Sequence, residues 1–137
     1  TGVQTCALPI FCIGNIMKPA EIIQKEFEKL GLDPKPRLQA IAYLLKKGKM
    51  KMMQQNDSVL LLQDIGDGNM ELHLFTQDTP MTLARSLKSF IDAIRKTKIK
   101  AVFGKADNPQ IVTFLKSLGV EVETQNLPKP YNWKATV

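Results

Sequence analysis

The chain has 137 residues and a formal net charge of +6, from 19 Lys and Arg residues against 13 Asp and Glu residues. This length is enough to bury the core of one domain and favours one domain over two. The positive charge permits contact with nucleic acid or with an acidic cofactor, but basic clusters are mostly solvated faces and require neither partner.

Residues 1–16 carry no charged side chain, which raises three structural alternatives: a signal peptide, a membrane anchor and a buried strand. A signal peptide has basic residues ahead of its apolar run, and none precedes Cys6 here. A spanning helix needs about 20 predominantly apolar residues, whereas Gly, Pro, Gln and Asn interrupt this shorter segment. A buried strand at residues 10–13 stays open as an alternative.

Residues 1–10 also resemble, letter for letter, a translated sequencing-library adapter, because the codons ACT GGA GTT CAG ACG TGT GCT CTT CCG ATC spell TGVQTCALPI. The resemblance implies a non-native or disordered leader over residues 1–16, a native start at Met17 and a single domain over residues 17–137. Cys6 and Cys12 both lie in this leader. The remainder then has no disulfide and no cysteine-based metal site, and its default compartment is the cytoplasm, with no membrane partner.

Two helices are predicted next. Residues 19–32 have apolar side chains at helical spacing with charged residues between them, which indicates an amphipathic helix that ends near Gly31. The D-P-K-P turn at residues 33–36 and a stop at Gly48 bound the second helix. One face of this second helix carries Leu38, Ile41, Ala42 and Leu45.

After Gly48 the pattern becomes that of β-strands. Residues 49–52 alternate, and residues 58–64 contain an apolar run too short for a helix, so the polar QQND between them predicts an antiparallel hairpin. The GDGN sequence at residues 66–69 tolerates positive φ and predicts a second hairpin. The third strand, over residues 70–76, places Met70, Leu72 and Leu74 on one face and Glu71, His73 and Phe75 on the other.

Thr79 and Pro80 predict the start of a long helix, since Thr can cap backbone N–H groups and Pro at the first position loses no hydrogen bond. Its buried stripe is Leu83, Leu87, Phe90, Ile91 and Ile94. A short strand at residues 101–103 follows, then a helix capped by Asp107 or Asn108 and ended by Gly119, then a strand at residues 120–123. The segment YNWKATV is predicted to be a last strand at the sheet edge.

This order predicts an α/β (α+β mixed) fold in which about four helices flank a mixed, mostly antiparallel sheet. From Pro19 onward it resembles the GNAT N-acetyltransferase superfamily, with the usual first strand missing or displaced. The most specific match is NPQIVTFLKSLGVEV, where Asn108 and Leu118-Gly119-Val120 stand at the positions of a GNAT Asn and Leu-Gly-Phe. Small, Lys-rich proteins of this kind also resemble, more weakly, genes of tailed bacteriophages.

The resemblance implies acetyl-CoA as co-substrate and an amine as acceptor. GNAT enzymes hold the acetyl-CoA pyrophosphate on N–H groups of a Gly-rich turn, where the helix dipole also favours negative charge. The matching stretch here, FTQDTPMTLARS, has no glycine, places Asp78 beside the expected phosphates and loses a donor at Pro80. The cofactor-binding residues that the resemblance implies are Leu74, Phe75, Thr76, Thr79, Thr82 and Asn108.

A second departure is Leu115, which stands where many GNAT enzymes carry a Tyr that protonates the CoA thiolate. Acetyl transfer also needs a base, and Glu71 and His73 share one face of the strand that lines this family's substrate cleft. Histidine is the better candidate, because its ordinary pKa of about 6.5 lies near neutrality. The alternative is a solvent-facing or structurally hydrogen-bonded His73. Tyr131 and Trp133 either wall a substrate pocket or pack at the sheet edge.

Three functions stay open on this basis. The first is an N-acyltransferase, and the second is a GNAT-fold binding or structural module without catalysis, which the missing glycines and Leu115 favour. The third is a nucleic-acid-binding domain, suggested by KKGKMK at residues 46–51 and KTKIK at residues 96–100, but no aromatic side chains are interleaved with these lysines. The sequence has no Walker-type loop, metal-ligand cluster or nucleophile elbow, so hydrolase, kinase and metalloenzyme functions have no support.

Overall fold

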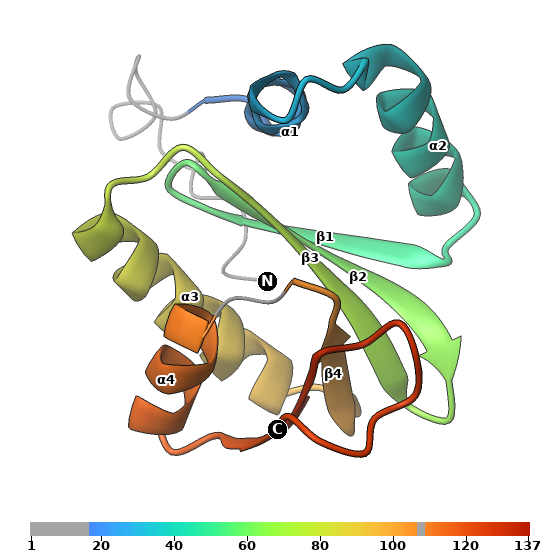
Figure 1. The fold of residues 1–137 in the computed structure, drawn as a ribbon. Helices are drawn as coiled ribbons and strands as arrows, with labels where there is room; N and C mark the ends of the chain where they lie inside the picture. Colours follow the sequence, from blue (N-terminus) through green and yellow to red (C-terminus); the bar gives the residue numbers. More distant parts are fainter. Residues whose placement is uncertain (1–16, 107–108) are drawn as a thin grey trace.

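The computed structural model describes residues 17–106 and 109–137, which form four helices and one sheet of six strands (Figure 1). Predictions for residues 1–16, and for Asp107 and Asn108 as helix cap and ligand, lie outside the described residues. In chain order the elements are α1 (Pro19–Lys29), α2 (Pro34–Lys46), β1 (Met50–Gln55), β2 (Ser58–Gly66), β3 (Asn69–Thr76), α3 (Pro80–Arg95), β4 (Ala101–Gly104), α4 (Pro109–Ser117), β5 (Glu121–Glu123) and β6 (Trp133–Thr136).

The sheet is mixed and mostly antiparallel, as predicted. Its strands lie in the order β1-β2-β3-β4-β6-β5. Only the neighbours β3 and β4 run parallel, and they pair from Asn69 with Ala101 to Glu71 with Phe103. The two predicted hairpins, β1–β2 and β2–β3, are both present and antiparallel. The predicted fold class is therefore confirmed.

The final strand, β6, lies inside the sheet, so its predicted place at the edge was wrong. It pairs with β4 on one side, where Trp133 faces Gly104, and with β5 on the other, where Lys134 faces Glu123. The edge strand at this end is the short β5, whose two glutamates are exposed. The physical reason is that Trp133 and Ala135 are buried on β6 and complete the core beneath the sheet.

Helices cover both faces of the sheet and divide the core into two layers (Figure 1). Helices α1 and α2 pack on one face, and α3 and α4 pack on the other. The central strand β2 is buried on both faces, which explains why residues 59–62 form a continuous apolar run rather than an alternating one. The layer under α1 and α2 contains Ile22, Ile23, Met50, Val59 and Leu61. The layer over α3 and α4 contains Leu60, Leu62, Met70, Phe90, Ile91, Ile94, Val102, Leu115, Val120, Trp133 and Ala135.

Helix α1 begins at Pro19 as predicted, but α2 begins at Pro34, inside the segment predicted to be a turn, because proline is well tolerated in the first turn of a helix. The Asp33 carboxylate accepts a 3.1 Å hydrogen bond from the N–H group of Lys35, which caps α2. Gly31 and Gly48 have φ of 72° and 73°, a left-handed conformation that glycine adopts without a Cβ penalty at helix ends. On α2, however, Ala42 is exposed rather than inward, and Leu44 packs against the core in its place.

The start of α3 differs from the prediction at its cap and on its buried face. Thr79 makes no side-chain cap; its hydroxyl instead donates to the hydroxyl oxygen of Thr82 at 3.1 Å. Leu83 and Leu87, predicted as core, are only partly buried, while Ser86 is fully buried between them. The fully buried apolar side chains of α3 therefore begin at Phe90, whereas Leu83 and Leu87 are less completely covered.

The turn between β3 and α3 is fastened by Asp78. Its carboxylate accepts hydrogen bonds from the hydroxyl of Ser58 at 2.6 Å, the hydroxyl of Ser86 at 3.2 Å and the N–H group of Asp57 at 3.0 Å. Asp78 is thus turned onto the end of the β1–β2 hairpin, which corrects its predicted place beside the phosphates. Because the Ser58 hydroxyl gives its hydrogen to Asp78, the Thr76 hydroxyl, 2.6 Å away, donates to Ser58.

Candidate active site

Strands β3 and β4 separate after a short parallel stretch. Their last paired residues are Glu71 and Phe103, and β4 ends one residue later at Gly104. Beyond that point β3 continues to Thr76 alongside β2 only, so residues 72–76 have no strand partner on the β4 side within the part of the chain that the structure describes. Backbone polar groups along this edge are free of strand pairing and are open to a ligand.

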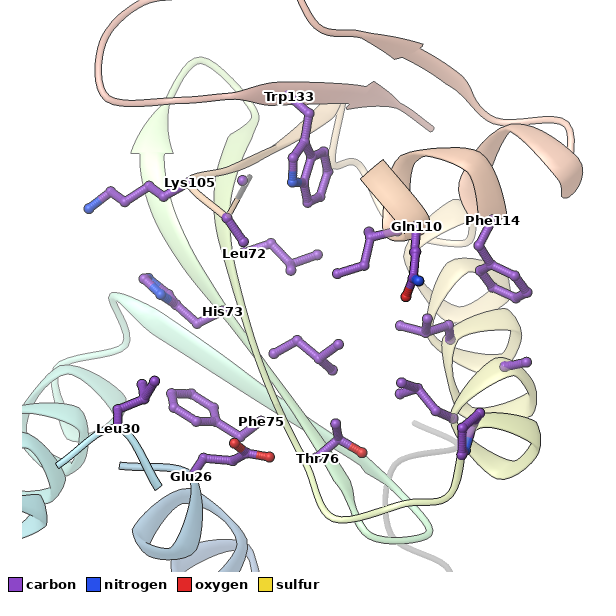
Figure 2. A pocket seen from close by; sticks show the side chains of 18 of the residues that line it. Glu26, Leu30, Leu72, His73, Phe75, Thr76, Lys105, Gln110, Phe114 and Trp133 are labelled. Atoms are coloured by element: carbon purple, nitrogen blue, oxygen red, sulfur yellow. The ribbon is translucent and has the colours of Figure 1, made fainter. Parts of the chain in front are cut away.

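A cavity of about 860 Å³ occupies the gap between the two strands (Figure 2). Its volume lies within the roughly 300–1,000 Å³ of typical small-molecule sites. On the side of α3 and α4 its wall is apolar and includes Leu72, Leu74, Leu83, Leu87, Ile111 and Phe114. On the side of α1 it is lined by Glu26, Phe27, Leu30, His73 and Phe75. The cavity therefore connects the two faces of the sheet.

His73 and Glu71 lie together on the α1 side of β3, as their alternate positions predict. The Nε2 atom of His73 is 2.6 Å from Oε2 of Glu71. His73 lines the cavity, whereas Glu71 is buried and is absent from the cavity wall. A carboxylate only accepts hydrogen bonds, so Nε2 carries the hydrogen, and in the neutral ring Nδ1 is the unprotonated nitrogen.

Glu71 is a buried carboxylate with three polar partners. Its other oxygen, Oε1, accepts a 2.7 Å hydrogen bond from the hydroxyl of Tyr131 and lies 3.5 Å from Nζ of Lys105. Burial raises the pKa of Glu71, but the Tyr131 hydrogen bond and the charges of His73 and Lys105 lower it by more, so the net pKa lies below its ordinary value. The hydrogen bond to Glu71, together with burial, raises the pKa of Tyr131. Glu71 is therefore a fixed negative charge at neutral pH.

The predicted cofactor-binding residues fall into two groups. Leu74, Phe75 and Thr76 line the cavity, although the Thr76 hydroxyl is engaged with Ser58 and leaves only backbone groups free. Thr79 and Thr82 lie at the start of α3, outside the cavity wall. The first backbone hydrogen bond there runs from Leu83 N–H to the Thr79 carbonyl at 2.8 Å, so the preceding N–H groups of this turn have no intrahelical partner.

Leu115 is a core residue, as the simpler interpretation predicted. It is buried in the layer over α3 and α4 and is not part of the wall of the large cavity. It supplies no proton at the position where the resemblance implies a Tyr. Among the described residues that line the cavity, the titratable side chains are those of Glu26, His73 and Lys105.

Trp133 and Tyr131 were expected either to wall a pocket or to pack at the sheet edge. Trp133 lines the cavity, whereas Tyr131 does not line it and contacts Glu71. The indole lies flat on Gly104, where a Cβ atom would come within 2.1 Å of the ring. Trp133 is 2% exposed, and its Nε1 atom has no hydrogen-bond partner among the described residues. An unmet buried donor of this kind costs about 1–3 kcal/mol.

Glu26 and Lys105 belong to the site without any sequence motif that marks them. Glu26 lies on α1. The sequence predicts which face of α1 is buried, but it does not predict which strand this face packs against. Its carboxylate accepts a 3.1 Å hydrogen bond from the Gln77 side chain, which ties α1 to the end of β3. Lys105 directly follows β4, and its place just after a strand is the one sequence signal that points to it.

The fold is GNAT-like: a mixed sheet opens between β3 and β4, helices cover both of its faces, and a cavity lies in the gap. Among solved structures, the chain is similar to the crystal structure of ribosomal-protein-alanine N-acetyltransferase from Brucella melitensis, with a TM-score of 0.53 and 14% sequence identity. The match covers 77% of this chain and 79% of that one. No family model and no curated protein matches the sequence. At this identity the likeness establishes the fold alone.

Two further findings concern what else the described residues contain. No helix among them is long and apolar enough to cross a membrane. Residues 17–106 and 109–137 also contain no group of three or more His, Cys, Asp and Glu side chains that could hold a metal ion.

Proposed function

We propose that the chain is an N-acyltransferase that moves an acetyl group from acetyl-CoA to an amine. The observation that carries this proposal is the place of His73: it lines the cavity in the opened sheet, and the buried carboxylate of Glu71 holds its ring. When bound, acetyl-CoA supplies an acetyl group activated as a thioester. The fold alone does not determine this function, because one fold hosts many activities.

The cavity fits this co-substrate in part. The unpaired edge of β3 at residues 74–76 would hold a chain of amide groups, and the apolar wall from α3 and α4 would cover its hydrocarbon parts. The first-turn N–H groups of Met81 and Thr82, with the hydroxyls of Thr79 and Thr82, would meet the phosphates at the start of α3. Asn108 stays a predicted ligand. The glycine-free turn before α3 is the part that fits least well.

The proposed chemistry assigns different roles to the two residues of the pair. The transfer would form a C–N bond to the acetyl carbon and break the thioester C–S bond, with the released thiolate protonated by solvent. Nδ1 of His73 takes the proton that the acceptor nitrogen loses, which contributes typically 10²- to 10⁴-fold to the rate. Glu71 contacts His73 rather than the reacting atoms, so it is a positioning residue that fixes the ring tautomer and stabilises the charged ring. The acceptor enters from the side of α1, where Glu26 is the carboxylate that the described cavity wall offers to a cationic amine.

Titration with acetyl-CoA tests this proposal most directly. Thermal-shift and calorimetric titrations would follow binding, and a thiol reagent would follow CoA release in the presence of a panel of amines. Binding at 100 times the dissociation constant adds about 2.7 kcal/mol to the free energy of unfolding. Adenosine 3′,5′-bisphosphate is the control that reports nucleotide binding alone. No stabilisation by millimolar acetyl-CoA would overturn the proposal.

A GNAT-fold binding module without catalysis is the second candidate, and buried Leu115 favours it. This candidate predicts that acetyl-CoA binds while no amine in the panel releases CoA above the background rate. Turnover that depends on His73 would exclude it.

A further inference from the structure

The indole N–H group of Trp133 is a buried donor without an acceptor, placed at the wall of the cavity. Trp133 is the single tryptophan of the chain. It is almost fully buried, and no described residue accepts a hydrogen bond from Nε1. Buried tryptophan N–H groups normally have a partner, so an unmet one beside a cavity indicates an acceptor that belongs to a ligand.

The fold holds this donor where the sheet opens. Glu71 and Phe103 are the last paired residues of β3 and β4, and Leu72 and Gly104 directly follow them. Gly104 in turn pairs with Trp133 on β6. Gly104 is what lets the ring lie there, because a Cβ atom would fall 2.3 Å from Nε1. Figure 2 shows the indole directed from β6 into the cavity, with its nitrogen on the edge away from Gln110.

The surroundings of the indole select a neutral acceptor. Leu72, Gln110 and Ile111 line the cavity together with Trp133, and none of these three side chains carries a charge. The ammonium of Lys105 is engaged with Glu71 on the opposite face, so it does not neutralise an anion beside the indole. Burying a charged oxygen there without a counter-charge is far more costly than burying a carbonyl oxygen.

We propose that Trp133 Nε1–H donates a hydrogen bond to the thioester carbonyl oxygen of the bound acyl-CoA. This inference rests on the proposed function. His73, the proposed base, is on β3 one position beyond Leu72, so the reacting carbonyl belongs at this level of the gap. A donor aimed at that oxygen stabilises the negative charge that develops on it during transfer, the kind of contact whose loss costs about 10²- to 10³-fold in turnover.

The first test is nuclear magnetic resonance of the indole proton, which gives one resolved signal because the chain has one tryptophan. Acetyl-CoA should move this signal downfield. S-ethyl-CoA, in which CH₂ replaces the carbonyl, should bind without that downfield movement. An equal shift with both ligands would assign the acceptor to another part of CoA and overturn the inference, as would acetyl-CoA binding with no shift.

The second test removes the donor and keeps the ring. Biosynthetic replacement of the single tryptophan by benzothienylalanine puts a sulfur atom in place of the indole N–H group. Replacement by 5-fluorotryptophan is the matched control, because it retains the N–H group. The benzothienyl protein should keep its melting temperature, bind acetyl-CoA about tenfold more weakly by calorimetry and bind S-ethyl-CoA unchanged. Trp133→Phe, checked for folding by circular dichroism, provides a genetically encoded version of the same test.

Two failures are distinguishable. If acetyl-CoA binds and CoA is released while the benzothienyl and fluorinated proteins have equal affinities, the role of Trp133 is wrong and the acyltransferase proposal stands. If acetyl-CoA fails to bind the unmodified protein, both proposals fall together.

Discussion

The hydroxyl of Tyr131 donates a 2.7 Å hydrogen bond to Oε1 of Glu71, and this bond joins the loop before β6 to the first half of β3. The Tyr131 ring also packs on Phe103, with ring centroids 5.1 Å apart. The buried carboxylate that positions His73 is thus covered by a segment that lies 60 residues further along the chain. Changes in that segment should reach the cavity through Glu71.

Replacing Tyr131 by Phe should lower the free energy of unfolding by about 1–3 kcal/mol, since it leaves a buried acceptor with one donor fewer. It should also raise the pKa of Glu71, because a hydrogen bond that lowers it is lost. Urea unfolding and carboxyl-carbon resonance titration measure the two effects. Tyr43→Phe is the matched control, because Tyr43 is exposed on α2 and its substitution should leave the free energy of unfolding unchanged. If Tyr131→Phe changed that free energy as little as Tyr43→Phe, the prediction would be wrong.

The lowered pKa of Glu71 predicts a specific loss of stability in acid. Its contribution is fully present above the ordinary value of 4.5, which the unfolded chain retains, and is lost as pH falls through the lower pKa of the folded protein. Glu71→Gln should therefore be less stable than the parent at pH 7, and the gap should close in acid. Denaturant unfolding between pH 7 and pH 2 measures this.

Glu123→Gln is the control for that pH series, because Glu123 is exposed on β5 and pairs with Lys134 at 3.8 Å. Exposed ion pairs contribute little, so its unfolding curve should follow the parent at every pH. If Glu71→Gln also ran parallel to the parent, the stabilising role of the Glu71 charge would be wrong.

Glu71 and His73 should behave as one unit in catalysis if the protein is an acyltransferase. His73→Gln should lower turnover by about 10²- to 10⁴-fold with little change in the acetyl-CoA dissociation constant. Glu71→Gln should lower turnover less and shift its pH profile. The double variant should be no slower than His73→Gln alone, because Glu71 acts through His73. Additive losses would show that the two residues act separately.

Gly104 should tolerate no side chain. A Cβ atom there would overlap the indole of Trp133 at 2.1 Å, so Gly104→Ala should destabilise the fold by about 1–3 kcal/mol. The displaced indole should also move its fluorescence to longer wavelength, a signal that comes from one residue. Ala106→Val adds volume at a nearby exposed position and should change neither quantity. An unchanged spectrum in Gly104→Ala would show that the ring does not rest on this glycine.

The features that were predictable from the sequence depend on local spacing. Gly48 and the GDGN turn mark where helices and hairpins change direction, and alternation along one strand is enough to place Glu71 beside His73. The position of β6 depends instead on which strands pair across distant parts of the chain. The sequence YNWKATV predicts a strand that carries Trp133, but it does not show between which strands this one lies.

The candidate site divides in the same way. Thr76, a predicted cofactor ligand, lines the cavity, yet its hydroxyl and the carboxylate of Asp78 serve the fold, because their partners come from the β1–β2 hairpin. Glu26 enters the site only because α1 crosses over the end of β3, where it meets Gln77. Such contacts follow from tertiary packing, which short motifs do not encode.

The insertion of β6 between β4 and β5 has a consequence for synthesis of the protein on the ribosome. Strands β1, β2 and β3 can pair as soon as they emerge, but β5 joins the sheet only through β6, which is made after it. A nascent chain that ends before Trp133 has an exposed β4 edge, a template for pairing with other chains. The same strand carries the indole, so a chain that ends before Trp133 also lacks this part of the cavity wall.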